Sequence, residues 1–114
     1  MLKKEVLRNK NDFSSIYRTG RSVGDRYVVL FFKKNGLGYN RTAFLASKKV
    51  GNSVRRNRAR RLMRESWRRI SEDLPDGYDF IIIARNTINE RSFQDVSSSL
   101  NHAVRRSRLK EQVK

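Results

Sequence analysis

The sequence predicts an α+β domain of two layers, in which helices pack on a small sheet. Segments with the period of an amphipathic helix alternate with short runs of β-branched and aromatic residues. The single proline and the six glycines fall at breaks between these segments, and no internal repeat or linker interrupts them. The 114 residues are 37% hydrophobic, which is enough for one modest core. We therefore expect a single domain over residues 1–114, with a solvated basic tail from about residue 105.

A short helix is the first expected element. Residues 11–20 place apolar side chains at i, i+3 and i+4, and such positions share one face of a helix. Asn11 or Asp12 can cap its start, because a side-chain oxygen there accepts a hydrogen bond from a free backbone N–H group. Gly20 stands where a glycine commonly ends a helix.

Two strands are expected next. Residues 26–34 and 41–47 are rich in β-branched and aromatic residues, which favour extended structure. The segment between them, residues 35–40, holds two glycines and predicts a turn. We therefore expect the two strands to pair as a hairpin.

A middle helix over residues 53–70, capped by Asn52 or Ser53, is predicted by its apolar period. The stripe that should face the core consists of Ala59, Leu62, Met63, Ser66, Trp67 and Ile70. After a turn at Pro75, residues 79–85 form an apolar run typical of a strand covered on both faces. If the strands around the middle helix are parallel, that helix is a crossover between them. The last amphipathic helix is marked by Phe93, Val96, Leu100, Ala103 and Val104.

The net charge favours a polyanionic partner. Twenty-seven Lys and Arg side chains against eleven Asp and Glu leave a formal charge of +16 and a pI near 11.2. So large a charge destabilises a compact chain by self-repulsion, and nucleic acid is the usual partner that compensates it. An anionic membrane surface is the main alternative.

The composition also bears on location. The chain has no cysteine, which excludes disulfides and thiolate metal sites and is typical of a reducing compartment. No apolar run approaches the ~18 residues of a membrane helix. The first residues carry charges and lack the apolar segment of a secretory signal. We expect a cytoplasmic protein that has no membrane partner.

The placement of the basic residues is more informative than their number. Residues 48–69 contain ten basic residues and one acid, Glu65. A row at successive i,i+4 positions consists of Arg56, Arg60, Arg64 and Arg68. Like charges at this spacing cost ~0.2–0.5 kcal/mol per pair, and arginines near a helix N-terminus also oppose the helix dipole. Phosphate binding explains the row, because guanidinium groups match phosphate oxygens.

A salt-bridged face or a membrane-bound helix accounts for the row less well than phosphate binding does. A solvated, salt-bridged face normally mixes charges of both signs, and here only Glu65 could pair, with Arg61 or Arg69. A helix on a membrane surface needs a free apolar face, and the apolar stripe of this helix is expected to face the core.

The residues around this helix resemble a known family. Residues 47–65 read SKKVGNSVRRNRARRLMRE, which is similar to the signature of the bacterial ribonuclease P protein subunit. In that family a strand that ends in serine and two lysines passes through a Gly-Asn turn into a helix that opens with Arg-Asn-Arg. Here this element is Arg56, Asn57 and Arg58. NDFSSIYRTGRSV, YVVLFF, DFIIIARN and the last helix also fall in the order of the family, so the resemblance covers nearly the whole chain.

The resemblance implies a more detailed fold than the pattern does. It implies a two-layer α-β-β-β-α-β-α sandwich with a small mixed sheet. An additional short strand would lie near residues 21–23, where the pattern shows only a loop. The crossover around the middle helix would be left-handed, against the usual right-handed rule.

The resemblance also implies a function. In the family, the protein pairs with a large catalytic RNA, and the complex removes the 5′ leader from precursor tRNA. Mg²⁺ is held mainly by the RNA, which carries out the hydrolysis. Carried over to this chain, the surface that docks on the catalytic RNA consists of Lys48, Lys49, Arg56, Asn57, Arg58, Arg60, Arg61, Arg64 and Arg68.

A cleft between the first helix and the sheet would hold the single-stranded leader. Its residues would be Phe13, Tyr17, Val29 and Phe31. Aromatic faces stack unpaired bases with little regard for sequence, as a groove for variable leaders requires. Tyr17 stands where many relatives carry phenylalanine, and stacking survives that change. Without the resemblance, these four side chains are interpreted as ordinary core.

No residues indicate that the chain is a nuclease on its own. Such an enzyme needs paired carboxylates, a metal cluster or a pair of histidines, and the single His102 has no histidine partner. The acids near Pro75 are typical of a solvated turn, with a weak Mg²⁺ site as the alternative: Glu72, Asp73, Asp76 and Asp79.

Two further classes of protein are compatible with the charge. A ribosomal protein would have similar size and basicity, but it would not require the Arg-Asn-Arg element. A protein that binds duplex DNA through the basic helix would need the second short helix of a helix-turn-helix, which the pattern lacks. We expect RNA and not DNA as the partner.

Overall fold

The structure is a computed structural model that describes residues 6–112. Within this range the main elements are α1 Lys10–Thr19, β1 Arg21–Gly24, β2 Val28–Lys34, β3 Arg41–Leu45, α2 Ser53–Ile70, β4 Tyr78–Ala84 and α3 Phe93–Ser107. Short 3-10 helices are η2 Ser71–Asp73, η3 Asn86–Ile88 and η4 Leu109–Gln112. The expected order of elements is confirmed. It includes the short strand β1, which the resemblance implied and the hydrophobic pattern missed.

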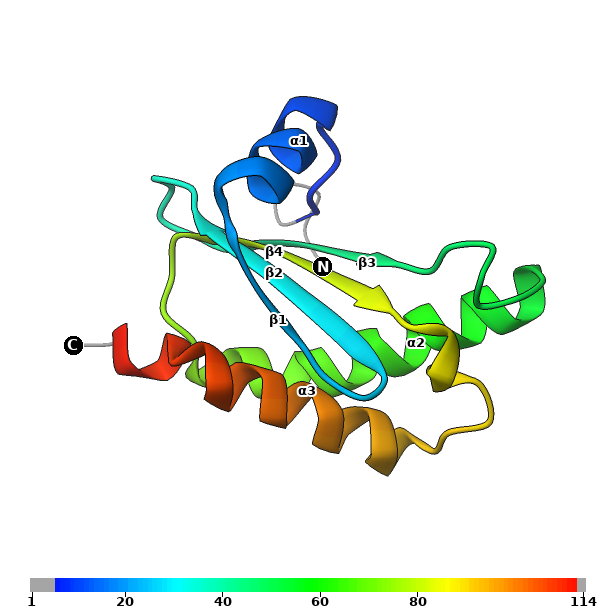
Figure 1. The fold of residues 1–114 in the computed structure, drawn as a ribbon. Helices are drawn as coiled ribbons and strands as arrows, with labels where there is room; N and C mark the ends of the chain where they lie inside the picture. Colours follow the sequence, from blue (N-terminus) through cyan, green and yellow to red (C-terminus); the bar gives the residue numbers. More distant parts are fainter. Residues whose placement is uncertain (1–5, 113–114) are drawn as a thin grey trace.

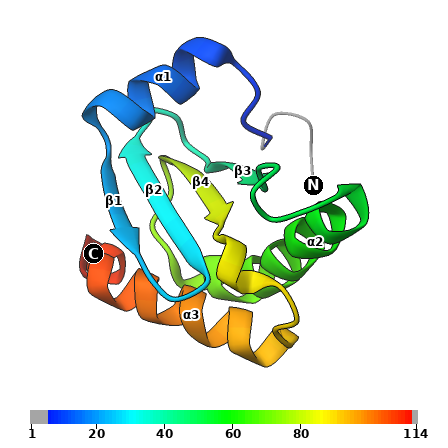
Figure 2. The same cartoon turned by 45° about the vertical axis from the view of Figure 1, so that its right-hand side comes forward.

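The strands form one mixed sheet in the order β1-β2-β4-β3. β2 is antiparallel to both β1 and β4, whereas β3 is parallel to β4. α2 connects this parallel pair and is therefore a crossover; its hand stays a prediction. Figures 1 and 2 show α2 and α3 on one face of the sheet and α1 on the other. The predicted α+β class, with helices packed on a small mixed sheet, is confirmed.

The predicted hairpin of residues 26–34 with residues 41–47 is wrong. β4 lies between β2 and β3, so that Ile82 has Leu30 on one side and Phe44 on the other. Because β4 is buried on both faces, it belongs at the centre of the sheet, where a strand has two neighbours. β2 pairs with β4 at one edge and with β1 at the other, so no edge of β2 is left to pair with β3.

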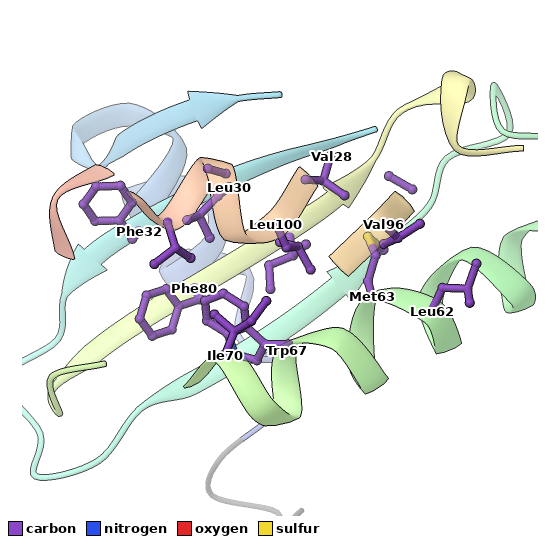
Figure 3. Packing of buried hydrophobic residues seen from close by; sticks show 14 of the residues in the cluster. Val28, Leu30, Phe32, Leu62, Met63, Trp67, Ile70, Phe80, Val96 and Leu100 are labelled. Atoms are coloured by element: carbon purple, nitrogen blue, oxygen red, sulfur yellow. The ribbon is translucent and has the colours of Figure 1, made fainter. Parts of the chain in front are cut away.

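The main core lies between the sheet and the two helices α2 and α3 (Figure 3). The predicted stripe of α2 is confirmed, because all six of its residues are buried. Trp67 meets Phe80 of β4 edge to face, with ring centroids 5.0 Å apart. In α3, four of the five predicted residues are buried: Val96, Leu100, Ala103 and Val104. Phe93, the fifth residue that marked this helix, is its first residue and is 41% exposed.

α1 begins earlier than predicted. Asn9 is its N-cap, and its side chain accepts a hydrogen bond of 2.8 Å from the backbone N–H of Asn11, so neither Asn11 nor Asp12 has that role. Gly20 does end the helix, but its backbone is extended and not left-handed. A Cβ there would lie 2.5 Å from the carbonyl oxygen of Ile16 and 2.9 Å from that of Phe32. The glycine is required by this close approach.

The predicted basic tail from about residue 105 is wrong as far as residue 112. α3 continues to Ser107, and η4 follows. Leu109 is 1% exposed and belongs to the main core. Arg108 takes a left-handed conformation (φ 62°) that turns the chain so that Leu109 can reach the core. The arginines of this segment are exposed while its apolar side chain is buried, so the segment packs as part of the domain.

We predict that replacing Leu109 with Ala lowers the free energy of unfolding by about 2–5 kcal/mol, because it removes a buried leucine from the core. Urea denaturation measures the change. Lys110→Ala, one residue further at an exposed position, is the control and should change stability by less than about 0.5 kcal/mol. Equal, small effects of both substitutions would show that the segment is a solvated tail.

Asp25 fixes the turn between β1 and β2 against α3. Its carboxylate accepts hydrogen bonds from the Ser99 hydroxyl at 2.9 Å and from the Arg26 backbone N–H at 2.7 Å. A guanidinium nitrogen of Arg106 lies 3.2 Å away. Burial raises the pKa of Asp25, but these hydrogen bonds and the charges of His102 and Arg106 outweigh burial and hold the pKa below its ordinary value.

The lowered pKa makes this contribution to stability depend on pH. The ionised form is favoured in the folded state, so the stabilisation is complete above the ordinary pKa near 3.8 and is lost as the pH falls through the lower folded value. We predict that Asp25→Asn costs about 1–3 kcal/mol of unfolding free energy at pH 7 and that this difference shrinks below about pH 4. Urea titrations across this range measure it. Asp76→Asn, at an exposed aspartate, is the control and should change stability at pH 7 by less than about 0.5 kcal/mol.

Candidate RNA-binding surface

The start of α2 is held by its own cap and by the connection from β3. The side chain of Asn52 accepts a hydrogen bond of 3.0 Å from the backbone N–H of Arg55. The first turn holds no acidic residue, so nothing there offsets the arginines that oppose the helix dipole. In the connection, Val50 is buried while Lys48 and Lys49 are exposed. The two lysines of the predicted docking surface therefore stand just before the helix and face solvent.

The arginine row of α2 is not neutralised within the protein. Among residues 6–112, no carboxylate lies within ion-pairing distance of any arginine of this helix, and the pairing of Glu65 with Arg61 or Arg69 does not occur. In the row, Arg64 and Arg68 are exposed, and Arg56 and Arg60 are partly buried. Outside the row, Arg61 and Asn57 are also exposed.

Four of the predicted docking residues, Arg58, Arg60, Arg64 and Asn57, also make side-chain contacts within the protein. The guanidinium of Arg64 lies over the ring of Phe44 at 5.6 Å. Arg60 donates a hydrogen bond to the side chain of Asn57. The buried Nε of Arg56 has no acceptor among the described residues, which costs stability. α2 thus keeps its cations where they weaken the helix, as the spacing predicted.

The loop after β4 supports the start of α2, which the sequence did not indicate. A guanidinium nitrogen of Arg58 donates a hydrogen bond of 2.7 Å to the carbonyl of Arg91. The side-chain amide of Asn89 donates one of 2.6 Å to the carbonyl of Val50. Both contacts join segments more than thirty residues apart, so no local pattern could have predicted them. Arg58, a predicted docking residue, therefore also has a structural contact.

Three of the four predicted cleft residues meet on the face of the sheet that carries α1. The ring of Tyr17 lies 5.0 Å from that of Phe31, edge to face, and 6.4 Å from that of Phe13. Tyr17 is 45% exposed, and partial burial raises the pKa of its hydroxyl, which therefore stays neutral. Val29 shares the strand face of Phe31 and pairs with Ile83. We call Phe13, Tyr17 and Phe31 the aromatic cluster.

The aromatic cluster is partly core. Phe13 and Phe31 pack against a second, smaller hydrophobic cluster made of Leu7, Ile16, Ala43 and Ile81. The interpretation as core therefore describes Phe13 and Phe31, and the cleft stays a prediction. Two rings contribute to packing under α1, whereas the side chain of Tyr17 is exposed.

An ion-pair network ties α1 to the sheet. Arg41 donates two hydrogen bonds to the carboxylate of Asp79, of 2.8 and 2.7 Å, and another of its nitrogens lies 3.2 Å from Asp12. The hydrogen bonds to Asp79 raise the pKa of Arg41 above its ordinary value. Asp79 is 5% exposed, so its predicted place in a solvated turn is wrong. Its ion-pair partner, Arg41, is 38 residues away in the sequence.

The described residues do not form a metal centre. Among residues 6–112, no three His, Asp or Glu side chains gather closely enough to hold a metal ion together. The acids near Pro75 therefore form no cluster of ligands for Mg²⁺. The helices in the same part of the chain include none that is long and apolar enough to cross a membrane.

The family is decided by comparison of the sequence with known families. The model of the Ribonuclease P family matches residues 1–112. This chain belongs to the ribonuclease P protein family. The ribonuclease P protein component of Pelotomaculum thermopropionicum is 40% identical over 105 residues, covering 92% of this chain and 94% of that protein. The corresponding component of Clostridium botulinum (strain Loch Maree) is 38% identical over 107 residues, covering 93% and 96%.

Solved structures of ribonuclease P proteins share the fold. The Staphylococcus aureus RNase P protein superimposes with a TM-score of 0.83 at 28% identity, covering 92% of this chain and 96% of that one. The RNase P protein from Thermotoga maritima gives 0.78 at 32% identity, covering 96% and 99%. Membership makes the chain the protein component of a ribonucleoprotein endoribonuclease with a role in tRNA processing, and RNA is its partner.

Proposed function

We propose that this chain docks on the catalytic RNA of ribonuclease P through α2 and supports removal of the 5′ leader from precursor tRNA. The observation that carries the proposal is a row of cations without carboxylate partners among the described residues: Arg56, Arg60, Arg64 and Arg68. Lys48, Lys49, Asn57, Arg58 and Arg61 would complete the docking surface. The family match favours this function over the ribosomal and DNA-binding alternatives.

In this proposal the chain supplies binding groups and the RNA supplies the chemistry. Mg²⁺ would be held mainly by the RNA, as the resemblance to the family implies. The two carboxylates with the most contacts have structural roles: Asp79 pairs with Arg41, and Asp25 holds a turn. Such groups, engaged with cations and backbone, are not arranged to activate water. A cytoplasmic location stays a prediction from the composition.

The leader of precursor tRNA would lie on the aromatic cluster. The support is geometric, because the cluster combines an exposed ring at Tyr17 with two rings that hold it in place. Single-stranded nucleic acid binds by stacking bases on such rings, and the contact tolerates any base. Val29, beside Phe31 on the same strand face, would extend the apolar surface.

We predict that the triple variant Arg56→Gln, Arg60→Gln, Arg68→Gln binds the catalytic RNA about 10²–10³-fold more weakly at 0.1 M salt. Each lost phosphate contact removes ~0.7–0.9 from the slope of log affinity against log salt, so the slope should fall by about 2–3. Glutamine keeps the helix propensity, and the loss of like-charge pairs should leave the helix as stable or more so. Filter binding at several salt concentrations measures both quantities.

The control for this variant removes the same charge elsewhere. Lys10, Lys34 and Lys110 are exposed and lie outside α2, so their replacement with Gln changes the net charge equally. This control should keep most of the affinity. If both triple variants lose affinity alike, net charge and not docking by α2 explains RNA binding.

We predict that Tyr17→Leu weakens binding of precursor tRNA to the reconstituted complex by about 5-fold or more and leaves mature tRNA unaffected. The reason is that leucine keeps apolar contact but offers no ring for a base, and such stacking contributes ~1–3 kcal/mol. Tyr17→Phe is the matched control, since it keeps the ring and should bind as the unchanged chain does. Equal losses of affinity for precursor and mature tRNA would show that Tyr17 has a purely structural role.

A further inference from the structure

A hollow of about 510 Å³ lies between the β1–β2 turn and α3, away from both surfaces described above. Its volume is within the usual range for a site that holds a small ligand or part of a larger one. The lining residues that carry a positive charge or a hydroxyl are Arg26, Tyr27, Ser98, Ser99, Arg105 and Arg106. None of these residues belongs to the Arg-Asn-Arg element or to the aromatic cluster.

The two acids of this hollow are already engaged. Asp25, one of the lining residues, accepts hydrogen bonds from Arg26, Ser99 and Arg106, and its side chain is 8% exposed. Asp95 belongs to the capping box of α3, where its carboxylate accepts a hydrogen bond from the backbone N–H of Ser92. Both carboxylates therefore serve the fold of this region.

The arginines of the hollow, in contrast, have unoccupied hydrogen-bond donors. Among residues 6–112, the guanidinium groups of Arg26 and Arg105 have no hydrogen-bond or ion-pair partner. Arg106 uses a single nitrogen, Nη1, for its contacts with Gly24 and Asp25, so its other nitrogens are available. Three guanidinium groups at one hollow repel one another, and an anion that binds there relieves this repulsion.

A chain of contacts joins the hollow to the start of α2. Arg58 of α2 donates a hydrogen bond to the carbonyl of Arg91, and the guanidinium of Arg91 lies over the ring of Tyr27 at 5.4 Å. Tyr27 lines the hollow. Arg85, at the start of the same loop, donates to the carbonyl of Asp25. Contacts through Arg91 and Tyr27 therefore connect the start of α2 to the hollow.

We propose that this hollow binds a phosphodiester group of RNA, as a second contact beside the docking surface on α2. The inference rests on the proposed function, because it takes the ligand to be an RNA that already lies on α2. Arg26 and Arg105 bind the phosphate oxygens, since their donors are unoccupied. Arg106 is held by Asp25 and adds its free nitrogens, and Ser98 can donate its hydroxyl. The phosphodiester belongs either to the catalytic RNA or to precursor tRNA.

The test is the double variant Arg26→Gln, Arg105→Gln, whose lost groups support no contact within the described part of the fold. We expect its affinity for the catalytic RNA to fall about 30-fold at 0.1 M salt, with a decrease of about 1.5 in the salt slope for two lost phosphate contacts. The control is Lys34→Gln, Lys110→Gln, which removes the same charge near the opposite end of the sheet. An affinity equal to that of this control, for both RNAs, overturns the proposal.

Two comparisons separate the possible sources and failures. A loss seen with the catalytic RNA alone assigns the phosphodiester to that RNA. A loss seen only when precursor tRNA binds the reconstituted complex assigns it to the substrate, and both results support the hollow. The α2 triple variant is measured in parallel. If that variant weakens binding and the hollow variant does not, only the present inference fails; if neither does, the proposed function fails as well.

A second measurement locates the RNA directly. Because the chain has no cysteine, Ser98→Cys creates a unique thiol at the hollow to which Fe(EDTA) can be attached. In the complex, the hydroxyl radicals it releases should cut the RNA backbone at nucleotides different from those cut from Val54→Cys at the start of α2. Cutting no stronger than from Lys34→Cys would show that no RNA lies at the hollow.

Discussion

The burial of one stripe of α2 is the interaction on which the rest of the structure depends. Four large side chains of the stripe, Leu62, Met63, Trp67 and Ile70, are buried, and each contributes roughly 1.5–3 kcal/mol. The repulsion among i,i+4 arginines costs only about 1 kcal/mol in all, so the stripe outweighs it severalfold. A helix with no acid in its first turn can therefore stay folded while its cations remain exposed. Since α2 also connects β3 to β4, the same packing fixes the parallel pair at the sheet edge.

The sequence predicted most elements of the fold but not how the strands pair. Hydrophobic period depends on each segment alone, and it identified α2, α3 and the central strand β4. Strand pairing depends instead on which strand needs a neighbour at both edges. Here that strand is β4, which follows β3 by more than thirty residues. β1 was invisible to the pattern because its residues are mostly exposed. The burial of Leu109 was missed for a related reason, since a single leucine in a basic segment forms no periodic hydrophobic pattern.

The candidate binding surfaces were predictable to different degrees. The arginine row followed from spacing alone, because i,i+4 positions share one side of any helix. The aromatic cluster needed the resemblance, since the pattern could not say on which face of the sheet α1 would pack. The contacts that hold these surfaces could not be predicted at all. Arg58 with Arg91 and Arg41 with Asp79 join distant segments, and a buried carboxylate looks like a solvated one until its partner is known.

Two of the proposed RNA surfaces, the docking surface on α2 and the aromatic cluster, lie on opposite faces of one sheet, and β4 is the strand they share. Ile82 packs in the main core with α2 and α3, whereas Ile81 belongs to the cluster under α1. This alternation is fixed by the pleat, so the sheet sets the separation between the α2 surface and the aromatic cluster. Asp79 on the same strand holds Arg41, which reaches Asp12 of α1. A buried ion pair adds little net stability. Its value here is positional, because the directional contacts of Arg41 with Asp12 and Asp79 favour one placement of α1 on the sheet.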